Sequence, residues 1–353
     1  MERKRVAILF GGCSSQYEVS LQSAYAVITH IDQERYEIIL IGIDKTGGWY
    51  LFQGEQEDIL SDNWKQKDTC IPVAVSPDKT LHGILLLKDT GVERLSLDAA
   101  LPILHGKNGE DGTVQGVLEL ADIPVIGCNT MSSAVCMDKE TAHRLAKESG
   151  VKVPDSYIIS KTDLQDVKQI LAYGKDLGYP LFVKPLRAGS SFGITRVTEE
   201  GELMAAAELG FTYDSQVILE EMIDGFEVGC AILGTEELTI GAVDEIELSE
   251  GFFDYTEKYT LKSSRIHVPA RVSREKEAQI KKTGVKIYRA LGCSFFARVD
   301  MFLTPEGEIY FNEVNTIPGF TAHSRYPNML KAAGISFEEI LLRLLEMVGN
   351  DNA

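Results

Sequence analysis

One stretch of the sequence, from Arg298 to Gly319, restricts the fold more than any other because it reads as two β-strands joined by a tight turn. Its turn, TPEG, carries Pro at the second position and Gly at the fourth. That arrangement suits a four-residue type I loop, which would close Leu303 against Glu308. Since the turn sets the register, a difference of one residue in the loop would change which side chains meet across the hairpin.

Four polar side chains are expected at the open end of this hairpin. Residues two apart on a strand share one face, so Arg298 lies beside Asp300 and Glu313 lies beside Asn315. The expected register puts Arg298 opposite Glu313. Oxygen ligands of this kind suit Mg²⁺ held against phosphates, with the arginine facing an anion. The ordinary alternative is an Arg–Glu cross-strand pair with solvated neighbours. Nearer the turn, the same face is expected to hold Phe302, Ile309 and Phe311.

Composition narrows the class of protein. At 353 residues, 44% of them hydrophobic and 25% charged, the chain is long enough for two or three domains of an ordinary soluble protein. Its six cysteines show no C-x-x-C spacing, which favours reduced thiols in a cytosolic enzyme over a disulfide framework or a zinc site. The formal net charge of −18 argues against a nucleic-acid or anionic-membrane partner. An anionic substrate would therefore have to be bound by individually placed lysines and arginines.

The first part of the chain predicts an α/β domain that closes near Cys128. RVAILFGG, EVSLQSAYAVITHI and YEIILIGID read in order as strand, helix and strand, which is typical of a Rossmann-like unit. The dinucleotide fingerprint G-x-G-x-x-G is absent, so nicotinamide chemistry is not supported. Residues 53–98 are expected to be irregular, as an insertion or a hairpin excursion. A helix is expected to follow over MSSAVCMDKETAHRLAKESG.

Two later motifs fit the binding of a nucleotide. KPLRAGSSFG follows a buried-looking strand, and its backbone amides could cradle phosphate while Lys184 supplies a cation. A Gly-Ser turn with a solvated lysine explains the same residues equally well. VILEEMIDGFEVG places Glu220 and Glu221 at a strand edge, where an adenine edge could be recognised, and Glu227 where ribose hydroxyls could bind. Acidic turns are common, so this pattern alone is weak.

The segment HGKNGEDGTVQG puts His105 at a strand end before a glycine-rich helix start. A hydrogen-bonded loop histidine and a substrate contact are the two interpretations, and the sequence favours the first. Helix capping is the ordinary role for Glu110, Asp111 and Thr113.

Glu18 lies three residues after Ser15 at an expected helix start, which is the spacing of a capping box. A carboxylate at that position could equally face an ammonium group across a cleft. The sequence leaves both interpretations open.

Taken in order, these motifs resemble the D-alanine-D-alanine ligase family of the ATP-grasp superfamily. The matching blocks are GGCSSQYEVSLQSA, LHGKNGEDGTVQG, MDK, FVKPLRAGSSFGI, FFDYTEKY, RVDMF and NEVNTIPGFTAHS, which span nearly the whole chain. GFTAHSRYP and FFDYTEKYTLKSS are similar to the vancomycin-resistance branch that makes D-alanyl-D-serine. The resemblance implies a three-domain α/β ATP-grasp ligase. Its expected domains are a Rossmann-like N-terminal domain (1–128), a central ATP-grasp subdomain (129–223) and a C-terminal ATP-grasp domain (224–353) with a lid loop at about 249–268.

The resemblance also implies roles for individual residues. Glu18 would bind the amine of the first D-alanine and form a hydrogen-bonded triad with Ser190 and Tyr259, and His105 would lie near that substrate's carboxylate. Arg298 and the amide of Gly319 would stabilise an oxyanion. The residues implied for the second substrate are Ser324 and Arg325, and those implied for two Mg²⁺ ions, which Mn²⁺ can replace, are Asp300, Glu313 and Asn315. The residues implied for ATP are Lys139, Lys184, Ser191, Glu220, Glu221, Ile223, Glu227 and Lys258.

The implied reaction phosphorylates D-alanine with ATP and joins the acyl phosphate to a second D-amino acid for peptidoglycan, in a cytoplasmic homodimer. Three positions depart from the common family pattern: Ala188, Phe320 and Arg325. A guanidinium beside the second site favours a hydroxymethyl group over a methyl group, so D-serine is the expected acceptor. D-alanine is the alternative, and Tyr259 argues against D-lactate. A non-catalytic ATP-binding protein and a dehydrogenase are the rivals from other classes.

Overall fold

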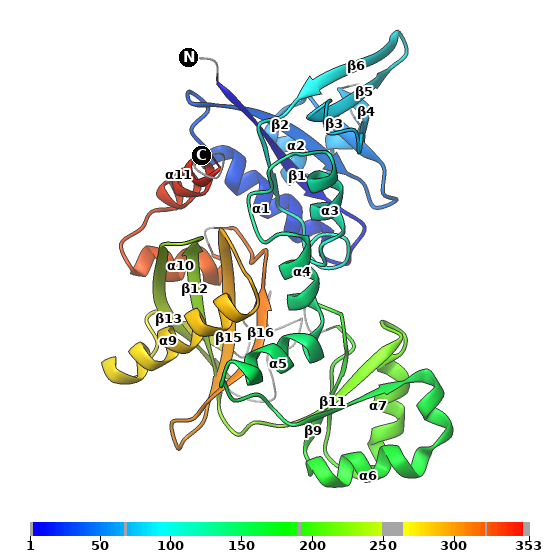
Figure 1. Ribbon diagram of the computed structural model, residues 1–353, viewed down its shortest axis with the longest axis vertical. Coiled ribbons are helices and arrows are strands. Elements are labelled where there is room, and N and C mark those ends of the chain that lie inside the picture. The colour runs from blue at the N-terminus through cyan, green and yellow to red at the C-terminus, as the bar shows by residue number, and fades with distance from the viewer. Residues whose placement is uncertain (1–2, 67–68, 190–191, 249–263, 322, 349–353) are drawn as a thin grey trace.

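The computed structural model describes residues 3–66, 69–189, 192–248, 264–321 and 323–348, which form a mixed α/β protein with three separate sheets. In Figure 1 the sheet nearest the N-terminus lies at the top, the last sheet lies below it to the left, and the smallest lies at the lower right. We call these the N-terminal, C-terminal and central sheets. The α/β class predicted from the sequence is confirmed.

The N-terminal sheet has seven strands in the order β6-β5-β4-β3-β2-β1-β7. Strand β1 pairs in parallel with β2 and with β7, as expected for a Rossmann-like unit, whereas β2 to β6 pair antiparallel. The strands are β1 (Lys4–Gly11), β2 (Tyr36–Ile43), β3 (Trp49–Phe52), β4 (Cys70–Val75), β5 (Gly83–Lys88), β6 (Gly91–Ser96) and β7 (Ala99–Pro102). The helices of this part are α1 (Tyr17–His30), α2 (Gln56–Leu60) and α3 (Thr113–Leu120), with a short 3₁₀ turn over Trp64–Gln66.

The expectation that residues 53–98 are irregular is wrong, although the hairpin alternative is right. This segment contains α2 and the strands β4, β5 and β6, which extend the sheet. Its strands are six residues long and are separated by polar turns, so their alternation is too short to stand out in the sequence.

The central sheet has four antiparallel strands in the order β10-β9-β11-β8. They are β8 (Ser156–Ser160), β9 (Leu181–Pro185), β10 (Thr195–Val197) and β11 (Gln216–Glu221). Helices α6 (Val167–Leu177) and α7 (Leu203–Gly210) pack on this sheet, and short 3₁₀ turns lie over Lys161–Gln165 and Glu200–Glu202. The Gly/Ser-rich segment of the sequence joins β9 to β10.

The C-terminal sheet has five antiparallel strands in the order β14-β13-β12-β15-β16. They are β12 (Phe226–Gly234), β13 (Leu238–Leu248), β14 (Ser264–His267), β15 (Phe296–Leu303) and β16 (Ile309–Asn315). The helices of this part are α9 (Arg274–Ala290), between β14 and β15, and α10 (Arg325–Ala332) and α11 (Phe337–Met347), after β16.

The single helix expected over 131–150 is two helices, α4 (Thr130–Met137) and α5 (Lys139–Glu148). They meet at Asp138, whose carboxylate accepts the backbone N–H of Thr141 at 3.0 Å and thereby caps α5. Both helices pack against the C-terminal sheet, because Cys136, Ala142 and Ala146 belong to the same buried cluster as strands β12 and β15.

The hairpin predicted from the sequence is β15–β16, but its register differs from the expected one. Leu303 pairs with Ile309, so the loop is one residue longer than predicted. A β-bulge next to Asp300 shifts the register by one more residue, so that Asp300 pairs with Glu313 and Arg298 pairs with Asn315 at the open end. Arg298 therefore does not face Glu313. The aromatic residue opposite Phe302 is Tyr310, whereas Ile309 and Phe311 lie on the other face of the hairpin with Leu303 and Met301.

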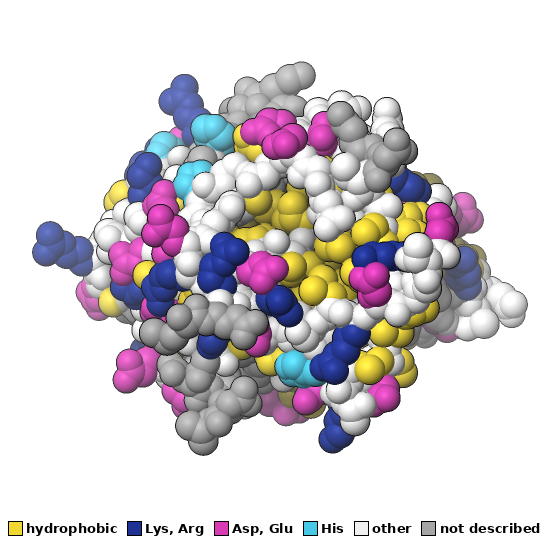
Figure 2. Space-filling model, turned by 90° about the horizontal axis from the view of Figure 1, so that it is seen from above, with side chains coloured by type: hydrophobic (Ala, Val, Ile, Leu, Met, Phe, Trp, Pro, Cys, Tyr) yellow, Lys and Arg dark blue, Asp and Glu magenta, His cyan; other side chains and the backbone are white. Residues whose placement is uncertain are grey.

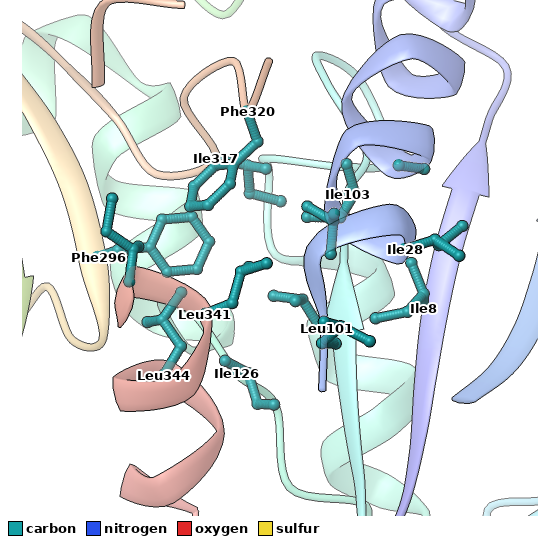
Figure 3. Close-up of a cluster of buried hydrophobic side chains, with 14 of the residues drawn as sticks. Ile8, Ile28, Leu101, Ile103, Ile126, Phe296, Ile317, Phe320, Leu341 and Leu344 are labelled. Atoms are coloured by element: carbon teal, nitrogen blue, oxygen red, sulfur yellow. The ribbon is translucent and has the colours of Figure 1, made fainter. Parts of the chain in front are cut away.

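One buried cluster joins the two ends of the chain. Ile8 and Leu101 of the N-terminal sheet, Ile28 of α1, and Leu341 and Leu344 of α11 are all at most 1% exposed and belong to it. Figure 3 shows Leu341 between α11 and Leu101, with Leu344 below Phe296 in the same core. The N-terminal sheet is consequently fixed against the C-terminal helices.

Charges of both signs are mixed over the surface. On the face shown in Figure 2, basic and acidic side chains alternate around a hydrophobic area. Among the described residues, no helix combines the length and the hydrophobicity needed to cross a bilayer. The six cysteines are free thiols.

Candidate active site

Two pockets meet at the open end of the β15–β16 hairpin. One, the N-terminal pocket, has a volume of about 380 Å³ and lies between the loops of the N-terminal sheet and the segment that follows β16. The other, the intersheet pocket, has a volume of about 590 Å³ and lies between the central and C-terminal sheets. Lys139, Ala188 and Glu313 line both pockets, so ligands in the two would be close to one another.

Most of the predicted site residues line one of these pockets. The N-terminal pocket is lined by His105, Arg298, Asn315, Gly319, Ser324 and Arg325. The intersheet pocket is lined by Lys184, Glu220, Glu221, Ile223 and Glu227. Ser190, Ser191, Lys258, Tyr259 and the main part of the lid loop lie outside the described residues.

The intersheet pocket contains a buried ion pair. Lys184, from the end of β9, contacts Glu220 of β11, and both side chains are under 10% exposed. Burial alone would raise the pKa of Glu220, but the ammonium of Lys184 holds it below its usual value. Among the described residues, the second carboxylate oxygen of Glu220 is buried without a hydrogen-bond partner. Buried polar atoms are normally hydrogen-bonded, so this oxygen is available to accept from a donor in the pocket.

Lys139 stands at the point where the pockets meet. It is the first residue of α5, and its Nζ donates to the carbonyl oxygen of Ala188 at 2.9 Å. The side chain is buried, because α5 packs against the C-terminal sheet. Lys139 and Lys184 thus supply positive charge beside the glycine-rich segment in a protein that is strongly acidic overall.

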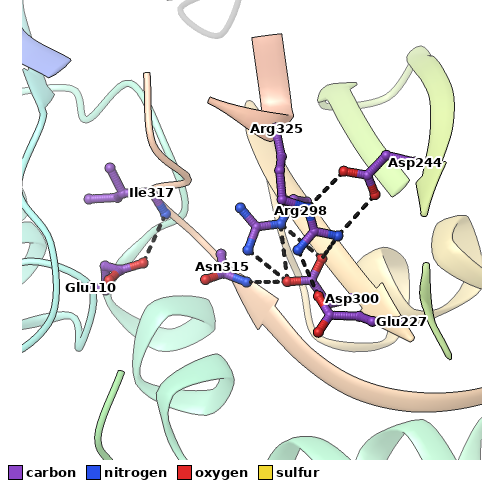
Figure 4. Close-up of polar contacts among 8 residues, drawn as sticks. All are labelled: Glu110, Glu227, Asp244, Arg298, Asp300, Asn315, Ile317 and Arg325. Atoms are coloured by element: carbon purple, nitrogen blue, oxygen red, sulfur yellow. Dashed lines mark hydrogen bonds and ion pairs between the residues drawn. The ribbon is translucent and has the colours of Figure 1, made fainter. Parts of the chain in front are cut away.

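A compact charge cluster lies at the end of the hairpin (Figure 4). The guanidinium of Arg298 donates to both carboxylate oxygens of Asp300, at 2.8 and 2.7 Å. Asn315 Nδ2 donates to the same carboxylate at 2.9 Å. Asp300 is 1% exposed and lies beneath the pocket surface, whereas Glu313 and Asn315 line it. The structure thus brings together all four polar residues predicted at this end.

Arg325, the first residue of α10, is buried among carboxylates. Its guanidinium donates to Asp244 at 2.7 and 2.9 Å and to Glu227 at 2.6 Å, and it lies 3.3 Å from Asp300. Gly229 permits this approach, since a Cβ there would come within 2.6 Å of Arg325 Nη2. Sequence reasoning missed Asp244, because it is 81 residues from its partner and lies in no recognisable motif.

The structure corrects the expectation for Glu18, which lies outside the pocket. Helix α1 begins at Tyr17 without a side-chain cap, so the predicted capping box is also absent. Glu18 faces outward and pairs with Lys45 at 2.8 Å. Because α1 turns by about 100° per residue, the positions that face the pocket are instead Gln16, Val19 and Gln22.

Gln16, the residue just before α1, is one of the polar side chains that line the pocket here. It is 7% exposed, and its Nε2 would lie 2.8 Å from a Cβ placed on Gly106 and 3.4 Å from one on Gly189. It thus reaches both the N-terminal loop and the glycine-rich segment of the central sheet. The sequence signal that could have identified Gln16 is its three-residue spacing from Val19 and Gln22, because residues three apart lie on one side of a helix.

His105 and Glu110 both contact the segment that follows β16. Nδ1 of His105 lies 3.0 Å from the carbonyl oxygen of Ile317, and burial lowers the pKa of this imidazole to about 4. Glu110 does not cap α3 as expected. Its carboxylate accepts the backbone N–H of Gly106 at 2.7 Å and that of Ile317 at 3.4 Å, and burial raises its pKa to about 7.

Comparison with known proteins agrees with this geometry. The family models for the D-ala D-ala ligase N-terminus and C-terminus match residues 5–128 and 145–346. The chain belongs to the D-alanine-D-alanine ligase family. Vancomycin C-type resistance protein VanC1 of Enterococcus gallinarum is 43% identical, with 99% of each chain covered. Vancomycin/teicoplanin A-type resistance protein VanA of Enterococcus faecium is 44% identical, with 98% of each covered.

A solved structure supports the same assignment. The VanG D-Ala:D-Ser ligase of Enterococcus faecalis superposes with a TM-score of 0.91 at 55% identity, covering 98% of this chain and 100% of that one. As a member of this ligase family, the chain is an ATP-dependent ligase that uses D-alanine.

Proposed function

We propose that this ligase joins D-alanine to D-serine through a D-alanyl phosphate, and that its product serves peptidoglycan synthesis with resistance to vancomycin. Similarity to the VanG ligase and to the named resistance proteins supports this proposal. By the same similarity we propose a cytoplasmic homodimer. The single observation that carries the choice of acceptor is Arg325 in the wall of the N-terminal pocket.

ATP would occupy the intersheet pocket. Glu220, whose second oxygen is buried without a hydrogen-bond partner in the described part of the chain, would accept from the adenine amino group beside Glu221 and Ile223, and Glu227 would bind the ribose. Lys139 and Lys184 would contact the phosphates, together with Ser191 and Lys258 by resemblance. The γ-phosphate would then lie near Glu313, where the two pockets meet, and within reach of a carboxylate in the N-terminal pocket.

The residues at the hairpin end fit Mg²⁺ by their chemistry. Asp300 and Glu313 form a cross-strand pair of carboxylates, and Asn315 adds an amide oxygen while its nitrogen donates to Asp300. Hard oxygen donors of this kind hold Mg²⁺, which screens the charge that develops during phosphoryl transfer. Asp300 is paired with Arg298 here. We propose that Arg298 turns from Asp300 toward the anionic substrate when the site is filled.

Acyl transfer would follow in the N-terminal pocket. The amine of D-serine attacks the carbonyl carbon of D-alanyl phosphate and gives up a proton as the C–N bond forms. The tetrahedral oxyanion then collapses, and phosphate leaves with the electrons of the broken C–O bond and takes up that proton. Arg298 and the amide N–H of Gly319 would stabilise that oxyanion. Ser324, whose Oγ would lie 2.9 Å from a Cβ on Gly319, would bind the acceptor carboxylate. Gln16 would take the place expected for Glu18 near the D-alanine amine.

The acceptor preference would come from Arg325. Its fork is fixed by Asp244 and Glu227, which accept three of its five N–H groups. A hydroxymethyl group can accept from an N–H group that remains, whereas a methyl group cannot, and a buried donor left without an acceptor is penalised.

The test is competition between D-serine and D-alanine for a limited pool of D-alanyl phosphate, with each dipeptide quantified. We expect D-alanyl-D-serine to predominate. Arg325→Lys keeps the charge but loses the fork, so the preference for D-serine should fall at least about tenfold. Arg343→Lys makes the same change in α11, away from the pockets, and should leave the preference unchanged. Predominance of D-alanyl-D-alanine in the wild type, or faster phosphate release with D-lactate, would contradict the proposal.

A further inference from the structure

The backbone of Ile317 is held on both sides by one loop of the N-terminal sheet. Glu110 Oε1 accepts its N–H at 3.4 Å, and Nδ1 of His105 lies 3.0 Å from its carbonyl oxygen (Figure 4 shows the Glu110 contact). The same carboxylate also accepts the N–H of Gly106, the residue next to His105, at 2.7 Å. Two side chains from a single loop thus fix the backbone of one residue that is 207 residues from Glu110 and 212 residues from His105 along the chain.

Ser23 of α1 completes this arrangement three residues further on. Its Oγ accepts the backbone N–H of Phe320 at 3.3 Å and lies 3.4 Å from Nε2 of His105. A carbonyl oxygen only accepts, so the proton of the neutral imidazole is on Nδ1, and Ser23 donates to Nε2. The hydrogen bonds therefore run from the N–H of Phe320 through Ser23 and His105 to the carbonyl of Ile317.

The residues between Ile317 and Phe320 are Pro318 and Gly319. Proline has no N–H, and the amide N–H of Gly319 has no hydrogen-bond partner among the described residues. Both residues line the N-terminal pocket. The turn is hydrogen-bonded at both of its ends, Ile317 and Phe320. The direction of the Gly319 N–H is therefore set by side chains that belong to the N-terminal part of the chain.

We propose that Ser23, His105 and Glu110 are positioning residues that aim the Gly319 amide at the oxyanion formed during acyl transfer. This inference rests on the proposed function of Gly319. An oxyanion donor is effective because it is already oriented when charge develops, and losing such a donor lowers kcat by roughly 10²–10³-fold in other enzymes. Loosening the turn should lose part of that factor without removing any group that touches ATP.

Ser23→Ala and Glu110→Gln test this inference in the full-length protein. Alanine removes the hydroxyl, and glutamine replaces one accepting oxygen with a donor that faces an N–H. In each variant we expect kcat for dipeptide formation to fall at least about tenfold, with the KM for ATP within twofold of the wild type. The rate of D-alanyl phosphate formation should also stay within twofold of the wild type. This rate is measured as the D-alanine-dependent exchange of oxygen isotopes between bridging and non-bridging positions of ATP.

Ser133→Ala is the matched control. It removes another fully buried serine hydroxyl, which donates to the carbonyl of Cys128 at 3.3 Å away from both pockets, and we expect its kcat within twofold of the wild type. Should Ser23→Ala fail to fold, Glu110→Gln carries the test. The inference is overturned if kcat is unchanged in the variants, or if isotope exchange falls as much as dipeptide formation. A wild type that forms no dipeptide with any acceptor would instead overturn the proposed function itself.

Discussion

His105 is kept neutral by burial, and this makes the stability of the protein depend on pH. Its pKa is about 4 in the folded protein and 6.5 in the unfolded chain. Between these pH values the unfolded state binds more protons, so the free energy of unfolding falls as the pH falls from 6.5 toward 4. For this residue alone the loss amounts to roughly 3 kcal/mol. Glu110 acts in the opposite direction, because its pKa is raised to about 7 and its contribution is lost as the pH rises through that value.

His105→Asn removes the titrating ring but keeps an N–H donor for Ile317. We expect its unfolding free energy, measured by urea titration from pH 7 to pH 4.5, to decline less steeply than that of the wild type. Ser133→Ala removes a buried hydrogen bond without removing a titratable group, so its curve should run parallel to the wild-type curve. Parallel curves for the wild type and His105→Asn would show that His105 contributes nothing to the acid sensitivity.

At the scale of elements, the two ends of the β15–β16 hairpin differ in role. The open end carries the proposed Mg²⁺ ligands and is called the chemical end here, whereas the turn at the other end only joins the two strands. Glu313→Gln at the chemical end removes a proposed Mg²⁺ ligand, so the Mg²⁺ concentration that gives half-maximal activity should rise at least about tenfold. Glu308→Gln lies at the turn of the same hairpin, where Glu308 is half-exposed and paired with Lys152. It should leave the Mg²⁺ requirement unchanged. Equal Mg²⁺ titrations for the two variants would remove Glu313 from the metal site.

The same hairpin shows which contacts of the site could be predicted from the sequence and which could not. Parity along the strands was sufficient to bring Arg298 and Asp300 together, because it depends on backbone geometry alone. The cross-strand partner was wrong, because the loop is one residue longer than expected and a β-bulge adds a further residue of shift. Contacts such as Arg325 with Asp244 join elements far apart in the chain, so they emerged only from the fold.

Helix α1 illustrates a different limit. Its existence was predictable from its apolar periodicity, but its first residue was not. Glu18 was placed in the site by resemblance, whereas the structure puts Gln16, Val19 and Gln22 beside the pocket. Which residue of a motif reaches the site depends on how the helix is rotated against its neighbours, and the fold sets that rotation.

At the scale of the whole molecule, the N-terminal sheet and the C-terminal helices share one core, and the positioning of Gly319 depends on that junction. Three residues of α1 are buried, with exposures of at most 1%: Ser23, Val27 and Ile28. Ile28 belongs to the cluster that also contains Leu344 of α11. Independent movement of the N-terminal sheet would pull the loop of His105 away from Ile317. We therefore expect the two parts to unfold together.

Leu344→Ala tests this coupling. Its fully buried side chain in α11 packs in the shared core, so its truncation should lower the free energy of unfolding by about 2–5 kcal/mol. Both tryptophans, Trp49 and Trp64, lie in the N-terminal part, so their fluorescence reports unfolding there, whereas circular dichroism reports the whole chain. If the two parts unfold together, Leu344→Ala shifts the fluorescence midpoint as far as the dichroism midpoint. The control is Leu120→Ala, whose side chain is 66% exposed and which should shift neither midpoint appreciably. If the dichroism midpoint moves and the fluorescence midpoint does not, the N-terminal sheet folds independently. The hydrogen bonds of Ser23 and Glu110 to the turn at Gly319 would then restrain that turn less than the shared core implies.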